Sequence, residues 1–371
     1  MQGLAQKPSV VIHVGAVSLL IHIHGVRPTL KRVLVALTTL VVGLLLGAFH
    51  RPAHQRLPEL PAPAAVRISA LELQPTEATY PAGLNTDPFT IANFLRSHPN
   101  AKLGPLWRRL GIPNDNRYYP DEACSYCEPN TFQYNLDNDS APEVVLQIKE
   151  PFAEGVKYLI FKQARDSNPK LIGHVETWTK YASSDPVVFV SNGRTWLIIE
   201  GTAATGSGLG AWVDTVYEVS DHRVKPLASY LARVTQTGNL GFPSKEFVAF
   251  PVSAEMEPGK FVLTLAYKVE YSGRRLGELP LFTKQQTVVL VNFLKDRSYY
   301  VDEARSDVAA VEFESVYNYD SMNEADFLRY NRNELFAIAN GTEAEKKSWL
   351  KEFLDTCPNY PVKRELLVGL K

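Results

Sequence analysis

The sequence predicts a mainly β protein, α+β overall. We expect antiparallel β-meanders, arranged as sandwich or propeller-like sheets, between an N-terminal helical segment and a C-terminal helical hairpin. Short runs of β-branched and aromatic residues recur from residue 131 to residue 306, and turn signals such as Asn192-Gly193 separate them. This spacing is typical of antiparallel sheets and not of βαβ units. With 371 residues, 45% of them hydrophobic, the chain is long enough to bury a sizeable core.

Residues 1–50 are predicted to be a membrane anchor or signal-anchor region. They carry four basic residues and no acid, and residues 33–49 form an apolar run without charge. At 1.5 Å per residue this run nearly crosses a hydrocarbon core of about 30 Å, so we expect a transmembrane helix there. The earlier apolar run, residues 9–26, is either a second span or an extension that the mature protein lacks. Each alternative places residues 51–371 outside the cytoplasm, in the periplasm or the extracellular space.

Four further segments follow the anchor. Residues 51–80 are rich in proline and alanine and are interpreted as a stalk. Residues 81–130 are expected to be a short helical and irregular segment, because Asp87 and Pro88 are a typical helix start and prolines follow. Residues 131–306 form the predicted antiparallel β domain. Residues 307–371 are the predicted helical hairpin, which packs on the β domain.

The elements of the last two segments have local signals of their own. Residues 156–176 and 212–231 look alike, which indicates either a duplicated meander or ordinary meander periodicity. Capping boxes at residues 321–324 and 342–345 predict the starts of two C-terminal helices. The second of these helices has Trp349, Leu350, Phe353 and Leu354 on one face, which we expect to cover the sheet.

Oxygen-bearing residues alternate along one polar stretch that leads into the apolar strand pattern of residues 143–148. The stretch places Asn135, Asp137, Asp139 and Glu143 at its first, third, fifth and ninth positions, with Ala141 at the seventh. Calcium prefers six to eight hard oxygen ligands, and a backbone carbonyl serves at a position such as that of Ala141. The alternative is a polar turn whose side chains cap their own backbone.

Residues 135–143 resemble the calcium loop of FG-GAP repeats, the repeats of integrin-type propellers. That family's pattern is Asp-x-Asp-x-Asp-Gly-x-x-Asp followed by an apolar strand. Asn135 here replaces a carboxylate, Ser140 replaces glycine, and Glu143 is longer than aspartate. The resemblance covers one nine-residue loop and implies one structural calcium ion, with no enzymatic activity. No whole-chain family is recognised.

The cysteines favour a structural disulfide over a redox-active site. Cys124 and Cys127 form a C-x-x-C motif between Pro120 and Pro129, where an irregular loop is expected. A redox site would need this pair at the start of a helix. In an oxidising compartment a Cys124–Cys127 disulfide is the preferred prediction, and Cys357 is then unpaired.

Two partner classes are excluded by charge and motif. Outside residues 1–50 the chain has 39 − 4 = 35 basic residues against 40 acidic ones, a net charge of −5, so nucleic-acid binding is not expected. Gly206, Gly208 and Gly210 precede a strand pattern and not a helix, so no nucleotide site is expected.

The sequence therefore favours a non-enzyme. We expect a membrane-anchored, extracytoplasmic binding or assembly module of the cell envelope, calcium-stabilised and with an envelope protein or glycan as partner. The membrane contact is assigned to residues 33–49. The first alternative is a hydrolase of cell-envelope material or glycans, whose carboxylates only the fold would bring together. The second is a thiol–disulfide redox partner that uses Cys124 and Cys127.

Overall fold

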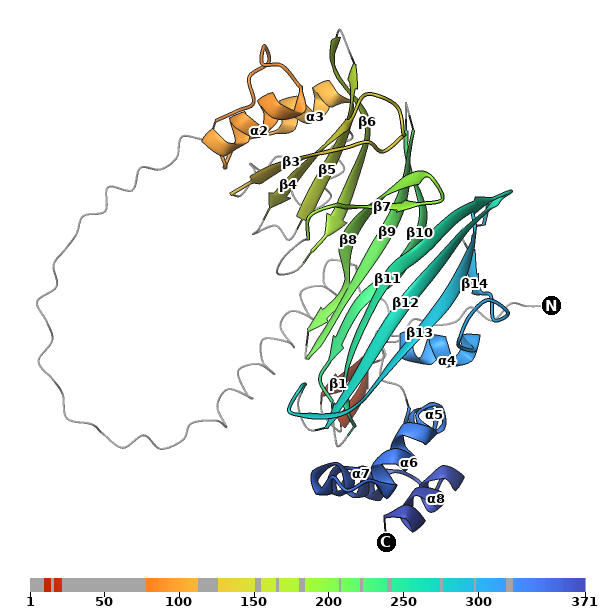
Figure 1. Cartoon of the computed structure of the whole chain (residues 1–371). Coiled ribbons are helices and arrows are strands. Elements are labelled where there is room, and N and C mark those ends of the chain that lie inside the picture. Colours follow the sequence, from red (N-terminus) through yellow and green to blue (C-terminus); the bar gives the residue numbers. More distant parts are fainter. Residues whose placement is uncertain are drawn as a thin grey trace, which may run out of the picture. The chain divides into compact units, whose positions relative to one another are not determined.

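Figure 1 shows the computed structural model of the chain. The structure describes residues 10–14, 17–21, 78–112, 126–150, 155–164, 167–179, 184–206, 208–220, 223–238, 242–273, 276–296, 298–317 and 323–370. The chain divides into two compact units, Met1–Glu72 and Leu73–Lys371.

The first unit contains a small β-hairpin where the first apolar run lies. Strand β1 (Val10–Val14) pairs antiparallel with β2 (Val17–Ile21), and Val10 lies opposite Ile21. The β-branched residues that fill this run favour a strand over a helix. Among the described residues, no helix is long and apolar enough to cross a membrane, so the predicted transmembrane helix and signal-anchor find no support in that part of the chain. Residues 33–49 themselves lie outside the described residues, as do residues 51–77 of the predicted stalk.

The second unit confirms the predicted fold class. Its described part contains twelve antiparallel strands in two sheets, with helices before and after them. The smaller sheet is a four-stranded meander of β3 (Glu128–Tyr134), β4 (Glu143–Glu150), β5 (Gly155–Ala164) and β6 (Ser167–Trp178).

The larger sheet has eight strands that also follow chain order. They are β7 (Val187–Ser191), β8 (Arg194–Gly206), β9 (Leu209–Ser220), β10 (Arg223–Gln236), β11 (Ser244–Glu257), β12 (Lys260–Gly273), β13 (Leu279–Phe293) and β14 (Ser298–Val301). The two similar stretches of sequence form the β5–β6 hairpin of the small sheet and the β9–β10 hairpin of the large sheet. The turn at Asn192-Gly193 is confirmed, because both residues have the positive φ that this two-residue turn requires.

The predicted N-terminal helical segment is confirmed by α2 (Pro88–Ser97) and α3 (Gly104–Leu110). Asp87 caps α2 by accepting hydrogen bonds from the amides of Phe89 and Thr90. Apolar residues of both helices pack with the β4 and β5 side chains of the small sheet: Ile91, Leu95, Leu106, Val144, Leu146 and Phe161. The helices therefore cover one face of the four-stranded sheet, as Figure 1 shows.

The two sheets share a core of their own. Side chains from β4, β5 and β6 pack with side chains from β8 and β9, and the cluster includes Val145, Tyr158, Ile172, Leu197 and Tyr217. The small sheet is thus held between helices on one side and the large sheet on the other.

The C-terminal segment is helical as predicted, but with more helices than one hairpin. They are α4 (Ala310–Tyr317), α5 (Glu324–Tyr330), α6 (Arg332–Asn340), α7 (Ala344–Thr356) and α8 (Pro361–Gly369). The predicted helix before Gly341 is broken at the buried Asn331, whose side-chain amide donates to the carbonyl of Phe327. The capping box at residues 342–345 does not form, because Glu343 is the N-cap of α7 and makes no side-chain capping bond. The four apolar residues of α7 are buried in the main core, as predicted.

Candidate functional site

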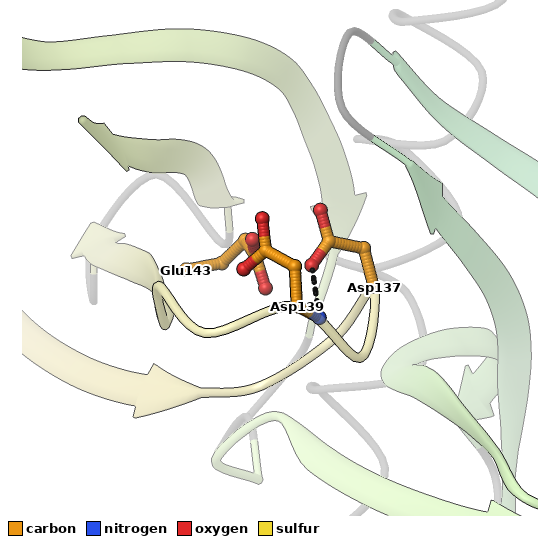
Figure 2. Close-up of side chains that lie close together, drawn as sticks. All are labelled: Asp137, Asp139 and Glu143. Atoms are coloured by element: carbon orange, nitrogen blue, oxygen red, sulfur yellow. Dashed lines mark hydrogen bonds between the residues drawn. The ribbon is translucent and has the colours of Figure 1, made fainter. Parts of the chain in front are cut away.

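The loop between β3 and β4 folds around its own acidic side chains. The amide of Asp139 donates to Asp137 Oδ1 at 3.2 Å, and the amide of Ala141 donates to Asp139 Oδ1 at 2.6 Å. Asn138 takes a left-handed backbone conformation, with φ of 64°, which asparagine tolerates better than most residues. Figure 2 shows the carboxylates of Asp137, Asp139 and Glu143 gathered on one side of this turn. One ligand oxygen from each lies within 4.8 Å of the others.

A lysine from the neighbouring strand contacts all three carboxylates. Lys162 on β5 lies opposite Glu143 in the β4–β5 register. Its ammonium Nζ is 2.6 Å from Asp139 Oδ2 and 2.8 Å from Glu143 Oε1, and it also pairs with Asp137 Oδ2. The Glu143 side chain is fully buried, and that of Lys162 is 15% exposed. The ammonium therefore lies among the carboxylates that a cation in this loop would bind.

The pKa shifts follow from these contacts. Burial lowers the pKa of Lys162, but hydrogen bonds with Asp137, Asp139 and Glu143 outweigh it, so the pKa is raised overall. The hydrogen bond from Lys162, together with the amide of Ala141, lowers the pKa of Asp139. The two pKa shifts favour a charged ammonium on Lys162 and a charged carboxylate on Asp139.

Three of the five predicted calcium ligands, Asp137, Asp139 and Glu143, are brought together. Asn135 donates its side-chain amide to the carbonyl of Asp139 at 2.8 Å and so stabilises the turn. The donor chemistry is of the hard oxygen type that calcium prefers. The position between the carboxylates, however, is taken by the Lys162 ammonium, so calcium does not fit while that side chain stays in place.

Sequence reasoning missed Lys162 because it lies 19 residues beyond Glu143. A signal was present: if residues 151–154 are taken as the turn of a hairpin, antiparallel pairing places Lys162 opposite Glu143.

The acidic loop also contacts the large sheet. Asn138 donates its side-chain amide to the carbonyl of Gly193 at 3.3 Å and accepts a hydrogen bond from the Thr195 hydroxyl at 3.2 Å. These two residues lie at the β7–β8 turn. The β7–β8 turn is itself fixed within the large sheet, because Asn192 donates its side-chain amide to the carbonyl of Ala254 on β11. The loop therefore fastens the small sheet to the large one.

A second pair of acids was not assigned from sequence. Glu200 on β8 lies directly opposite Asp214 on β9, and the Tyr230 hydroxyl donates to Asp214 Oδ2 at 3.0 Å. Burial, with a contribution from the charge of Glu200, raises the pKa of Asp214 to about 6. Arg233 lies 3.9 Å from Glu200 and stacks over the ring of Trp212. Only strand pairing joins these residues, so spacing along the chain contains no signal for them.

The cysteines are partly described. Cys127 is buried, with 3% exposure, and is disulfide-bonded, whereas Cys357 is a buried free thiol. Cys124 lies outside the described residues, so its pairing with Cys127 stays a prediction.

One surface feature has no counterpart in the sequence motifs. Val248, Phe250 and Val252 on β11 are all exposed, Phe250 by 54%, and they alternate with buried residues of the core. We name these three residues the β11 strip. Val190 on β7 is also exposed, and its neighbour Ser191 accepts a hydrogen bond from the amide of Ala254 on β11. Large apolar side chains gathered in this way are typical of interaction surfaces.

No protein-family model matches the chain, and no curated protein sequence is significantly similar to it.

Proposed function

We propose that this protein is a non-catalytic binding or assembly module that works outside the cytoplasm, in the cell envelope. The β11 strip is the observation that carries the proposal. The strip offers a partner protein an apolar surface, whereas Phe247 and Ala249 of the same strand are buried in the main core. The disulfide at Cys127 supports an oxidising compartment.

The strip lies on a rigid support, which favours binding over a role in folding alone. β11 pairs with β12 along its whole length and with β10 at its beginning, and Phe247 before the strip and Ala249 within it are buried. A partner would therefore meet side chains whose backbone is already ordered, which lowers the entropic cost of binding.

The test is removal of the strip. The double variant Phe250→Ser, Val252→Ser should lose self-association in sedimentation experiments or, for a monomeric protein, at least half of its binding of an apolar fluorescent probe. Val311→Ser on α4 is the matched control, because Val311 is 57% exposed and lies outside the strip. A wild-type protein that neither self-associates nor binds the probe would contradict the proposal.

A second candidate function is glycan hydrolysis, which the Glu200–Asp214 pair specifically favours. An acid with a pKa near 6 beside a second carboxylate is the arrangement of a general acid and its partner. Here Asp214 would donate the proton and Glu200 would act as base or nucleophile. Release of reducing sugar from cell-wall glycan should then fall about 100-fold or more in Glu200→Gln and in Asp214→Asn. A wild-type protein that cleaves none of these glycans rejects this candidate.

The redox alternative gains no support. Exchange through Cys124 and Cys127 needs an accessible sulfur, and Cys127 is buried.

A further inference from the structure

The carboxylates of the β3–β4 loop need a positive charge to remain together. Three carboxyl groups bring one oxygen each to within 4.8 Å of the others, and one of them, Glu143, is fully buried. A buried carboxylate is tolerated when a cation and hydrogen-bond donors face it. The Glu143 Oε2 atom accepts from the Leu136 amide at 2.7 Å, and Oε1 faces the Lys162 ammonium.

We propose that Lys162 is the resident cation of this loop. Its ammonium lies between the three acids that the sequence predicts as calcium ligands, so the loop keeps its geometry without a metal. The ammonium contacts one oxygen from each of the three carboxylates, as an ion at the centre would. The cation is therefore supplied by the chain itself, from the strand next to the loop.

Strand register makes this cation a permanent part of the site. Lys162 lies directly opposite Glu143 in the terminal pair of the β4–β5 register, the adjacent Phe161 pairs with Val144, and on its other side Lys162 pairs with Lys170 of β6. A group held this way competes with ions in solution at a high effective concentration. Calcium would also have to displace the ammonium from carboxylates that leave it only 15% exposed, and would then need further oxygen ligands.

The consequence is a metal-independent clamp between the two sheets. Lys162 holds the acidic side chains of the loop, and the loop holds Asn138 against Gly193 and Thr195 of the β7–β8 turn. The sheets therefore stay fastened whether or not calcium is present.

The first experiment needs no variant. The intact protein is acetylated with an amine-reactive ester, with and without millimolar calcium, and the rate at each lysine is followed by mass spectrometry. Lys157 is the internal control, because it lies on the same strand, is 17% exposed and has an ion pair with the more exposed Glu176. We expect Lys162 to react about tenfold or more slowly than Lys157, at a rate that calcium leaves unchanged, because three carboxylates enclose its ammonium, whereas Lys157 pairs with one exposed carboxylate. A rate equal to that of Lys157, or one that calcium increases, overturns the proposal.

The second experiment replaces the ammonium. Lys162→Gln should lower the melting temperature by several degrees in EDTA and should recover about half of that loss in millimolar calcium, since the freed carboxylates can then bind the ion. Lys157→Gln should change little and should show no calcium response. A calcium-dependent rise in the melting temperature of the wild-type protein, abolished by Asp139→Asn, would overturn the proposal even if Lys162→Gln does not fold.

Discussion

The buried Glu143 and the half-buried Asp214 have opposite electrostatic surroundings. Glu143 faces the ammonium of Lys162, whereas Asp214 faces another acid, Glu200, across the β8–β9 pairing. The Tyr230 hydroxyl donates to Asp214, but burial and the charge of Glu200 dominate and raise the pKa of Asp214 to about 6. Like charges directly opposite each other on paired strands destabilise a sheet. Asp214 therefore costs stability whenever it is ionised.

This cost predicts a pH dependence at the scale of one residue. The folded protein binds the Asp214 proton more tightly than the unfolded chain does, so stability falls as pH rises from about 4 to about 6. Asp214→Asn removes this fall and should be more stable than wild type by about 2 kcal/mol at pH 7, with the difference vanishing below pH 4. Urea unfolding at both pH values measures it. Asp355→Asn, at an exposed position on α7, is the control, and an equal gain at both pH values would contradict the assignment.

At the scale of elements, α7 shows how a helix is fixed to the end of a strand. Trp349 stacks parallel to Phe353, with ring centroids 5.4 Å apart, and its indole lies against Gly273 at the end of β12. A Cβ atom at Gly273 would lie 2.7 Å from Trp349 Cδ1, so the glycine leaves the space that the indole fills. The helix and strand are therefore complementary in shape at this point.

This contact predicts a large effect of one truncation. Trp349→Ala should destabilise the protein by about 3–5 kcal/mol, because it removes a buried aromatic side chain and leaves a cavity. Lys351→Ala on the exposed side of the same helix should cost less than about 0.5 kcal/mol. Both values come from urea unfolding followed by far-ultraviolet circular dichroism. A Trp349→Ala effect as small as the control would show that α7 does not pack on the sheet as described.

At the scale of the whole second unit, the two sheets meet through close backbone contact as well as through the acidic loop. Gly173 on β6 lies against Val224 on β10, and a Cβ atom at Gly173 would lie 2.4 Å from Val224 Cγ2. These two residues belong to the two hairpins that look alike in sequence. A side chain at position 173 would therefore push the sheets apart.

A double-mutant cycle tests this contact. Gly173→Ala should destabilise the protein by about 1–3 kcal/mol through overpacking, and Val224→Ala in the same chain should recover most of that loss. His174→Ala, at the exposed neighbouring position, should be close to neutral. Additive effects of the two substitutions, with no recovery, would mean that residues 173 and 224 are not in contact.

Much of the fold could be predicted because its signals are local. Asp87 and Pro88 start a helix, Asn192-Gly193 makes a tight turn, and alternating apolar residues form strands, each through interactions within a few residues. The same holds for the acidic loop, whose Asp137, Asp139 and Glu143 converge as predicted. Local signals also misled: the apolar run of residues 9–26 left a second membrane span as one alternative, whereas its β-branched residues favour strands and the structure has a hairpin within it.

The sequence by itself determined the fold class, the turn at Asn192-Gly193 and which three acids lie in the β3–β4 loop. Only the tertiary structure decided which cation faces those acids, that Glu200 and Asp214 are paired, and that Val248, Phe250 and Val252 remain exposed. The physical reason is that register and packing join residues far apart in the chain. A carboxylate's chemistry depends on the charge placed across from it, and strand pairing, which spacing along the chain does not encode, makes that placement.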